Sequence, residues 1–253
     1  DPVARLSRMT IAQTRDESQV LQRMAHALLR DAAAAVAESS AGAGPGTDPR
    51  LRVALAEVAA RRGAEVTLVA GPVERPTPAG VVRIDVETAE QLLAAMDDRL
   101  RAAPVELVAM VAAVADLTPR QTRAGKLDKA DLPQAMEAGA WVEGVDVLAT
   151  LCQRHGARAF FLGFGAQTVD DGQDVPASLR EAGQRKLARK GCHAIFVNRV
   201  GVADTGFASA TNTGLLVGRE GEPVEDAGPP MAKAALAGWL LDRLHARVGG
   251  ARS

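Results

Sequence analysis

The chain has 253 residues, enough for one large α/β domain, and 47% of them are hydrophobic, which is typical of a protein with a buried core. Its 30 Lys and Arg residues are balanced by 31 Asp and Glu residues, so charge gives no reason to expect binding to nucleic acids or anionic membranes. No apolar run approaches the roughly 20 residues of a transmembrane helix, and the polar segment 1–8 lacks the apolar stretch of a signal peptide. We therefore expect a cytoplasmic protein.

The first 46 residues predict a strand over 9–16, an amphipathic helix over 17–38 and a Gly-rich loop over 39–46. In the predicted helix, Leu21, Met24, Ala25 and Leu28 recur at the i, i+3, i+4, i+7 spacing of one helix face. That face would serve either as an extra layer packed on the domain or as an assembly surface. We expect residues 1–46 to be a divergent amino-terminal segment and residues 47–253 to be the α/β body of the protein. The two together are expected to form one domain.

Helices and strands alternate through the body of the chain. A helix is expected from Pro49 to Arg62, followed by Gly63 as its C-terminal cap, and Thr88 with Gln91 makes a capping box for another helix. The remaining predictions are strands at 65–70, 81–86, 106–111, 157–162, 193–197 and 214–217, and helices at 88–101, 145–154, 177–190 and 231–247. This alternation predicts an α/β fold with a mostly parallel central sheet.

In an open parallel sheet, ligands bind outside the carboxyl ends of the strands. That rule selects the residues expected to follow strands, namely 71–72, 113–116, 164–168 and those from 198 onward. Asp116 is placed to bind a base, a ribose or a metal, but an Asp there is also a common turn or cap residue. Lys126 and Lys129 would neutralise phosphate oxygens in such a site, or would simply be solvated surface lysines.

Two later features fit the same kind of site. Phe164 would stack on a base or fill the core, and core is the more common role of such a residue. Lys186 and Lys190 are four residues apart and share a helix face, where they would hold an anion or form part of a solvated basic stripe. The two cysteines, Cys152 and Cys192, lack metal-ligand spacing and are interpreted as reduced thiols.

Taken in order along the chain, these motifs resemble the phosphopantothenate–cysteine ligases, the synthetase half of the bifunctional coenzyme A biosynthesis proteins. The resemblance covers about residues 50–245. It is carried by Ala64-Glu-Val-Thr-Leu-Val-Ala-Gly-Pro-Val73, Ala112-Ala-Val-Ala-Asp116, Lys126-Leu-Asp-Lys129, Asp146-Val-Leu148, Gly163-Phe164, Lys186-Leu-Ala-Arg-Lys190 and Val197-Asn198.

The resemblance implies a Rossmann-like three-layer sandwich with a small dimerisation arm, and a homodimer. It implies ligation of 4′-phosphopantothenate with cysteine through an acyl-cytidylate, with CTP as co-substrate and Mg²⁺ as cofactor. Lys126 would be the catalytic residue. The nucleotide-binding residues would be Met110, Val111, Ala112, Asp116, Lys126, Asp146, Phe164, Lys186 and Lys190. FMN is not expected, because the Pro-Ala-Ser-Ala-Asn-Thr motif of the flavoprotein decarboxylase half is absent.

The amino-terminal segment departs from the family pattern. The family's Asp-Pro-Val-Arg to Asn segment is replaced by the predicted helix, so the Asn used around the acyl-cytidylate has no counterpart, and Gln167 stands where the family has Glu. Three functions therefore stay open: the ordinary ligase, a relative that activates a different carboxylate, and a nucleotide-binding or assembly protein without turnover.

Overall fold

The computed structural model of the chain describes residues 27–29, 49–71, 76–111, 117–119, 141–170, 172–201 and 209–250. The strand predicted at 9–16 and the loop predicted at 39–46 lie outside these residues.

Within the described residues, an eight-stranded sheet forms the centre of the molecule, in the order β11-β10-β8-β7-β4-β1-β2-β3. Its strands are β1 (Ala27–Leu29), β2 (Val66–Ala70), β3 (Val81–Asp85), β4 (Leu107–Met110), β7 (Phe160–Thr168), β8 (Ala194–Val200), β10 (Leu215–Gly218) and β11 (Glu225–Asp226). Every pairing from β3 across to β8 is parallel, whereas β10 pairs antiparallel with both of its neighbours, β8 and β11. The predicted α/β fold with a mostly parallel sheet is confirmed.

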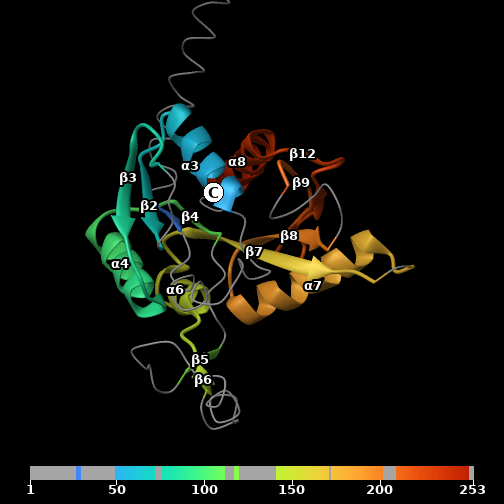
Figure 1. Cartoon of the computed structure of the whole chain (residues 1–253), viewed down its shortest axis with the longest axis horizontal. Coiled ribbons are helices and arrows are strands. Elements are labelled where there is room, and N and C mark those ends of the chain that lie inside the picture. Colours follow the sequence, from blue (N-terminus) through green and yellow to red (C-terminus); the bar gives the residue numbers. More distant parts are fainter. Residues whose placement is uncertain are drawn as a thin grey trace, which may run out of the picture.

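Helices cover both faces of this sheet, as Figure 1 shows. They are α3 (Pro49–Arg61), α4 (Ala89–Ala102), α6 (Val147–His155), α7 (Val175–Lys190) and α8 (Lys233–Gly250). One core cluster joins α3 and α8 to the sheet through side chains such as Leu55 and Leu240. A second cluster joins α4, α6 and α7 to the opposite face through Leu92, Leu151 and Leu179. The result is a three-layer, Rossmann-like sandwich.

Local signals in the sequence set the helix ends. The Thr88 hydroxyl accepts from the Gln91 amide at 3.2 Å, and the Gln91 side chain accepts from the Thr88 amide at 3.2 Å, so the predicted capping box is present. Gly63 follows α3 with φ of 87°, in the left-handed region that a glycine adopts without steric cost. Asp174 caps the start of α7, where its carboxylate accepts from the Ala177 amide at 3.1 Å.

The helix predicted over 17–38 is wrong at Ala27–Leu29. These three residues form β1, which pairs in parallel with β2 on one side and with β4 on the other. Such a short apolar run fits a central strand as well as a helix face, and its hydrophobic periodicity does not distinguish the two. Backbone hydrogen bonds to two neighbouring strands, which no local pattern encodes, decide the outcome.

The prediction that residues 164–168 follow a strand is also wrong, because β7 continues to Thr168. Residues 198–200 likewise belong to β8, and the two strands pair in register from Leu162↔Ala194 to Thr168↔Val200. Their mutual backbone hydrogen bonds allow both strands to extend beyond the end of β4. The glycines in this stretch look like turn residues in the sequence, but here they lie under side chains from α6 and α7.

A buried carboxylate joins α4 to α6. Asp97 is 5% exposed, and its Oδ1 accepts from His155 Nε2 at 2.6 Å. Its Oδ2 pairs with Arg101 at 2.6 Å and with Arg154 at 3.0 Å, while Arg158 donates to His155 Nδ1 at 3.0 Å. The hydrogen bond from His155, together with the nearby arginine charges, outweighs burial and lowers the pKa of Asp97.

The part of the chain that the structure describes also contains two small sheets outside the central one. Strands β5 (Leu117–Pro119) and β6 (Trp141–Glu143) pair antiparallel and project from the body as an arm in Figure 1. Strands β9 (Thr211–Asn212) and β12 (Met231–Ala232) pair near α8. Among the helices of the described residues, none has the length and apolar character needed to cross a membrane.

Candidate active site

The carboxyl edge of the sheet has a step between β4 and β7. Met110 is the last residue of β4 and pairs with Gly163, whereas β7 continues to Thr168. Met110 and Val111 are each 3% exposed, so their side chains are packed in the core. Beyond Gly163, no described strand pairs with β7 on the β4 side. We call this place the β4–β7 step.

Asp146 and Lys190 meet beside this step. Asp146 is the N-cap of α6, and its Oδ1 accepts from the Ala149 amide at 3.1 Å. Its Oδ2 accepts from Lys190 Nζ at 2.6 Å, with 19% of the Lys190 side chain exposed. One carboxylate therefore caps α6 and ties it to the last turn of α7. Two residues that were predicted to bind nucleotide are paired with each other.

Lys186 lies one helical turn before Lys190, and its stem covers Gly165 of β7. A Cβ atom at Gly165 would lie 2.9 Å from Lys186 Cδ and 3.2 Å from Cε. Only glycine leaves room for the lysine stem to lie flat on the strand. The residue type at 165 thus sets the position of the Lys186 ammonium group.

A cavity of about 290 Å³, which we call the α7 hollow, opens next to Lys186. Its lining consists of Gln167, Ala182, Arg185, Lys186 and Arg189. Arg185 forms an ion pair with Glu181, and Lys186 and Arg189 are the other positively charged side chains of the lining. The i, i+3, i+4, i+7 spacing of Ala182, Arg185, Lys186 and Arg189 places them on one face of α7.

Phe164 lies on the opposite face of the sheet from Lys186. Its partly buried ring packs against the α3 and α8 cluster and contacts Phe196 at a centroid distance of 5.8 Å. Successive strand residues point to opposite faces, so Phe164 and Gly165 cannot both face α7. The ring packs against the core, and its contact with a nucleotide stays a prediction. A ligand would contact both Phe164 and Lys186 only by spanning the β4–β7 step.

Three of the predicted site residues, Ala112, Asp116 and Lys126, lie outside the described residues. Their placement relative to the β4–β7 step stays a prediction. Within the described residues, no group of three or more His, Cys, Asp or Glu side chains is arranged to hold a metal ion.

The two thiols behind the site are buried. Burial raises the pKa of Cys152 to about 12 and that of Cys192 to about 11. Both thiols are therefore protonated and unreactive at neutral pH, as expected for the free, reduced cysteines predicted from the sequence.

Comparison with known proteins identifies the family. Residues 49–248 match the model of the DNA/pantothenate metabolism flavoprotein C-terminal domain. The chain belongs to this family. The match spans the described body from α3 to α8, so it includes the strands and helices on both sides of the β4–β7 step.

Members of the family with similar sequences carry the name coenzyme A biosynthesis bifunctional protein CoaBC. The protein from Vibrio cholerae is 34% identical over 199 residues, which cover 79% of this chain and 46% of that protein. The protein from Mycobacterium tuberculosis is 35% identical over 208 residues, covering 79% and 47%. The chain thus spans about half the length of these relatives, and the resemblance noted in the sequence is confirmed.

A solved structure of the same family has the same fold. The crystal structure of the C-terminal domain of a coenzyme A biosynthesis bifunctional protein CoaBC superposes with a TM-score of 0.61 at 22% identity. The superposition covers 90% of this chain and 99% of that domain. The similarity supports the three-layer arrangement.

Proposed function

We propose that this domain ligates 4′-phosphopantothenate with cysteine, using CTP and passing through an acyl-cytidylate. The observation that carries the proposal is the convergence of Lys186, Lys190 and Asp146 at the β4–β7 step. This is the edge of the sheet where open α/β folds bind ligands. The family match and the shared name of its curated relatives supply the substrate class.

The proposed reaction has two steps. The phosphopantothenate carboxylate attacks the α-phosphorus of CTP, and the bond to the bridging oxygen breaks to release pyrophosphate. The cysteine amine then attacks the acyl carbon, and CMP leaves as the new amide loses a proton. The protein must hold the triphosphate, align the attacking carboxylate and neutralise charge at phosphorus.

The site residues at the β4–β7 step have the following roles in this scheme. Lys186, held on Gly165, offers its ammonium group to phosphate oxygens near the α7 hollow. Lys190 adds a second positive charge, and its Asp146 partner fixes its position until phosphate arrives. Backbone groups at Met110 and Val111 border the nucleotide. By family resemblance, Lys126 stabilises the charge that develops at the α-phosphorus.

Magnesium enters the proposal together with the nucleotide. Mg²⁺ prefers oxygen ligands and commonly takes several of them from substrate phosphates and water. The carboxylate that pairs with Lys190, Asp146, is already shared with the α6 cap. We therefore assign the ion's main contacts to the triphosphate, where it would neutralise phosphate charge.

A pyrophosphate-release assay tests the proposal directly. The assay combines Mg²⁺, 4′-phosphopantothenate, cysteine and one nucleotide at a time. We expect release that requires both CTP and phosphopantothenate. Lys186→Ala should lower kcat/KM about 100-fold, because it removes a charge that contacts the phosphates. Arg180→Ala is the matched control, since it removes an exposed positive charge from the same helix outside the α7 hollow.

The other outcomes point to different functions. Pyrophosphate release that requires a carboxylate other than phosphopantothenate would indicate a related ligase. Nucleotide binding by calorimetry without any release would indicate a binding or assembly protein. An equal loss of activity in both variants would remove Lys186 from the nucleotide site.

We further propose that the domain forms a homodimer through the arm built from β5 and β6. The arm pairs only its own two strands within the described residues and stands away from the central sheet (Figure 1). Two-stranded ribbons are marginally stable alone, so packing against a second arm would stabilise it. Light scattering that gives the mass of one chain would contradict this proposal.

A further inference from the structure

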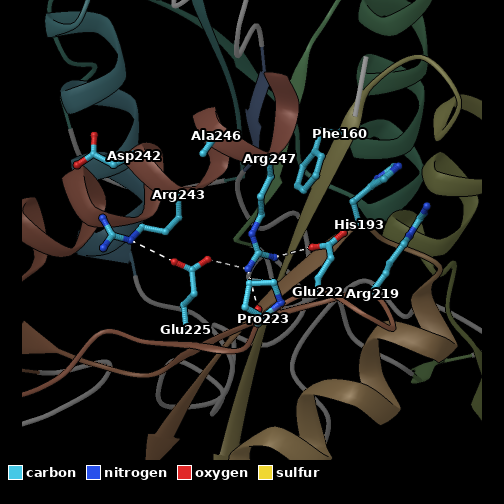
Figure 2. Close-up of a pocket in the computed structure, with 10 residues that line it drawn as sticks. All are labelled: Phe160, His193, Arg219, Glu222, Pro223, Glu225, Asp242, Arg243, Ala246 and Arg247. Carbon is cyan, nitrogen blue, oxygen red and sulfur yellow. Dashed lines mark hydrogen bonds and ion pairs between the residues drawn. The ribbon is translucent and has the colours of Figure 1, made fainter. Parts of the chain in front are cut away.

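A second and larger cavity, of about 680 Å³, lies at the amino ends of the parallel strands. Figure 2 shows it between the starts of β7 and β8, the turn that joins β10 to β11, and the last turns of α8. Phe160 is the first residue of β7 and His193 immediately precedes β8, whereas the β4–β7 step begins beyond Gly163 of β7. We call it the amino-edge cavity. Its volume lies within the roughly 300–1,000 Å³ of small-molecule sites.

The carboxylates of the amino-edge cavity are all paired with arginines. Arg247 donates to Glu222 at 2.9 Å and to Glu225 at 2.8 Å, and Arg243 pairs with Glu225 at 3.3 Å. Asp242 pairs with Arg62 at 2.6 Å, from outside the cavity. The negative charges in the wall are therefore neutralised by arginines that hold α8 to its neighbours.

Arg219 differs from the other arginines of this cavity. Its Nε donates to the Cys192 carbonyl at 3.3 Å, and its Nη2 donates to the Gly191 carbonyl at 3.3 Å. Both bonds are long and go to uncharged acceptors, and no described carboxylate forms an ion pair with Arg219. An incoming anion would give this guanidinium shorter, charge-assisted bonds.

The wall beside Arg219 is flat and uncharged at neutral pH. The His193 ring stacks on Phe160 at 4.9 Å, and its Nδ1 accepts from the Phe161 amide at 3.0 Å. Burial and the nearby Arg219 charge lower the pKa of His193 to about 4, so the ring is neutral at pH 7. Pro223 and Ala246 add apolar surface to the lining.

We propose that the amino-edge cavity binds a small organic anion, with its carboxylate or phosphate group on Arg219 and its apolar body against His193 and Pro223. Guanidinium groups bind both kinds of oxyanion with two parallel hydrogen bonds. The site lies at the opposite edge of the sheet from the lysines of the β4–β7 step, and the proposal does not rest on the ligase activity.

The test is a binding titration of the whole chain with benzoate and with phenyl phosphate, followed by amide chemical shifts in NMR spectra. We expect saturation with a Kd of about 1 mM for at least one of them. Acetate, which lacks the ring, and benzyl alcohol, which lacks the charge, should each bind at least about tenfold more weakly. A preference between the two anions distinguishes a carboxylate ligand from a phosphate ligand.

Variants locate the binding. Arg219→Gln should weaken binding at least about tenfold, whereas Arg180→Gln, an equal change of charge on the exposed face of α7, should not. Lys186→Ala should also leave benzoate binding unchanged. Ala246→Trp keeps Arg219 and fills the cavity, so it should abolish binding even if Arg219→Gln fails to fold. No saturation up to about 20 mM, or full binding by both Arg219→Gln and Ala246→Trp, would overturn the proposal.

Discussion

His193 makes the stability of this domain sensitive to mild acid. Its Nδ1 accepts from the Phe161 amide at 3.0 Å, and its ring stacks on Phe160. Burial and the Arg219 charge lower the pKa of His193 to about 4, whereas an unfolded histidine has a pKa near 6.5. Protonation would place a proton on the nitrogen that accepts the Phe161 hydrogen bond, so the fold requires the neutral ring.

The sign and the size of the effect follow from this difference. Above about pH 6.5 His193 is neutral in both the folded and the unfolded chain, so it costs no stability. As the pH falls from about 6.5 to about 4, the unfolded chain takes up a proton that the folded chain rejects. Stability then falls by up to about 1.4 kcal/mol per pH unit, to a limit of about 3 kcal/mol. Between about pH 7 and about pH 5, the expected loss is about 2 kcal/mol.

Urea unfolding of the wild type and of His193→Asn at about pH 7 and about pH 5 measures this loss. Asparagine keeps a side-chain acceptor for the Phe161 amide but does not titrate, so the variant should lose about 2 kcal/mol less than the wild type. Its stability at neutral pH sets a baseline and does not enter the comparison. An identical loss in both proteins would show that His193 is not the group responsible, and the reasoning would fail.

Three further predictions concern the site and its supports. Gly165→Ala should move the Lys186 stem, whose Cδ would lie 2.9 Å from the new Cβ, and so weaken nucleotide binding in calorimetry by about tenfold. Asp146→Asn should lower the free energy of unfolding by less than about 1 kcal/mol, since the pair with Lys190 is partly exposed. Asp146→Ala should lower it by about 1 kcal/mol more, because it also removes the α6 cap. Equal losses for the two variants in urea unfolding would contradict this division. Asp97→Asn should cost about 2 kcal/mol in urea unfolding at neutral pH, because it removes the buried acceptor for a histidine and two arginines. That cost should shrink as the pH falls through the lowered pKa of Asp97, and a cost independent of pH would exclude the carboxylate charge as its source.

Much of the fold was readable from the sequence because local signals repeat at every boundary. The capping box at Thr88, Gly63 after α3 and the apolar run at 107–110 each act within a few residues of chain. Their alternation leaves few arrangements other than a parallel sheet covered by helices. The order of the motifs along the body then indicated the family, because that order can be recognised without knowing which distant residues are in contact.

The tertiary structure decided what local patterns leave open. A periodic apolar stretch around Ala27–Leu29 became a central strand because two neighbouring strands satisfy its backbone. The sequence predicts both Phe164 and Lys186 as site residues. Successive side chains of β7 point to opposite faces, however, so the two lie on opposite faces of the sheet. The sequence by itself determined the family, and it predicts a ligand site at the carboxyl edge of the sheet. Only packing decided that Lys190 is paired with Asp146, that Gly165 sets the position of Lys186, and that Arg219 faces a second cavity, because each depends on side chains far apart in the chain.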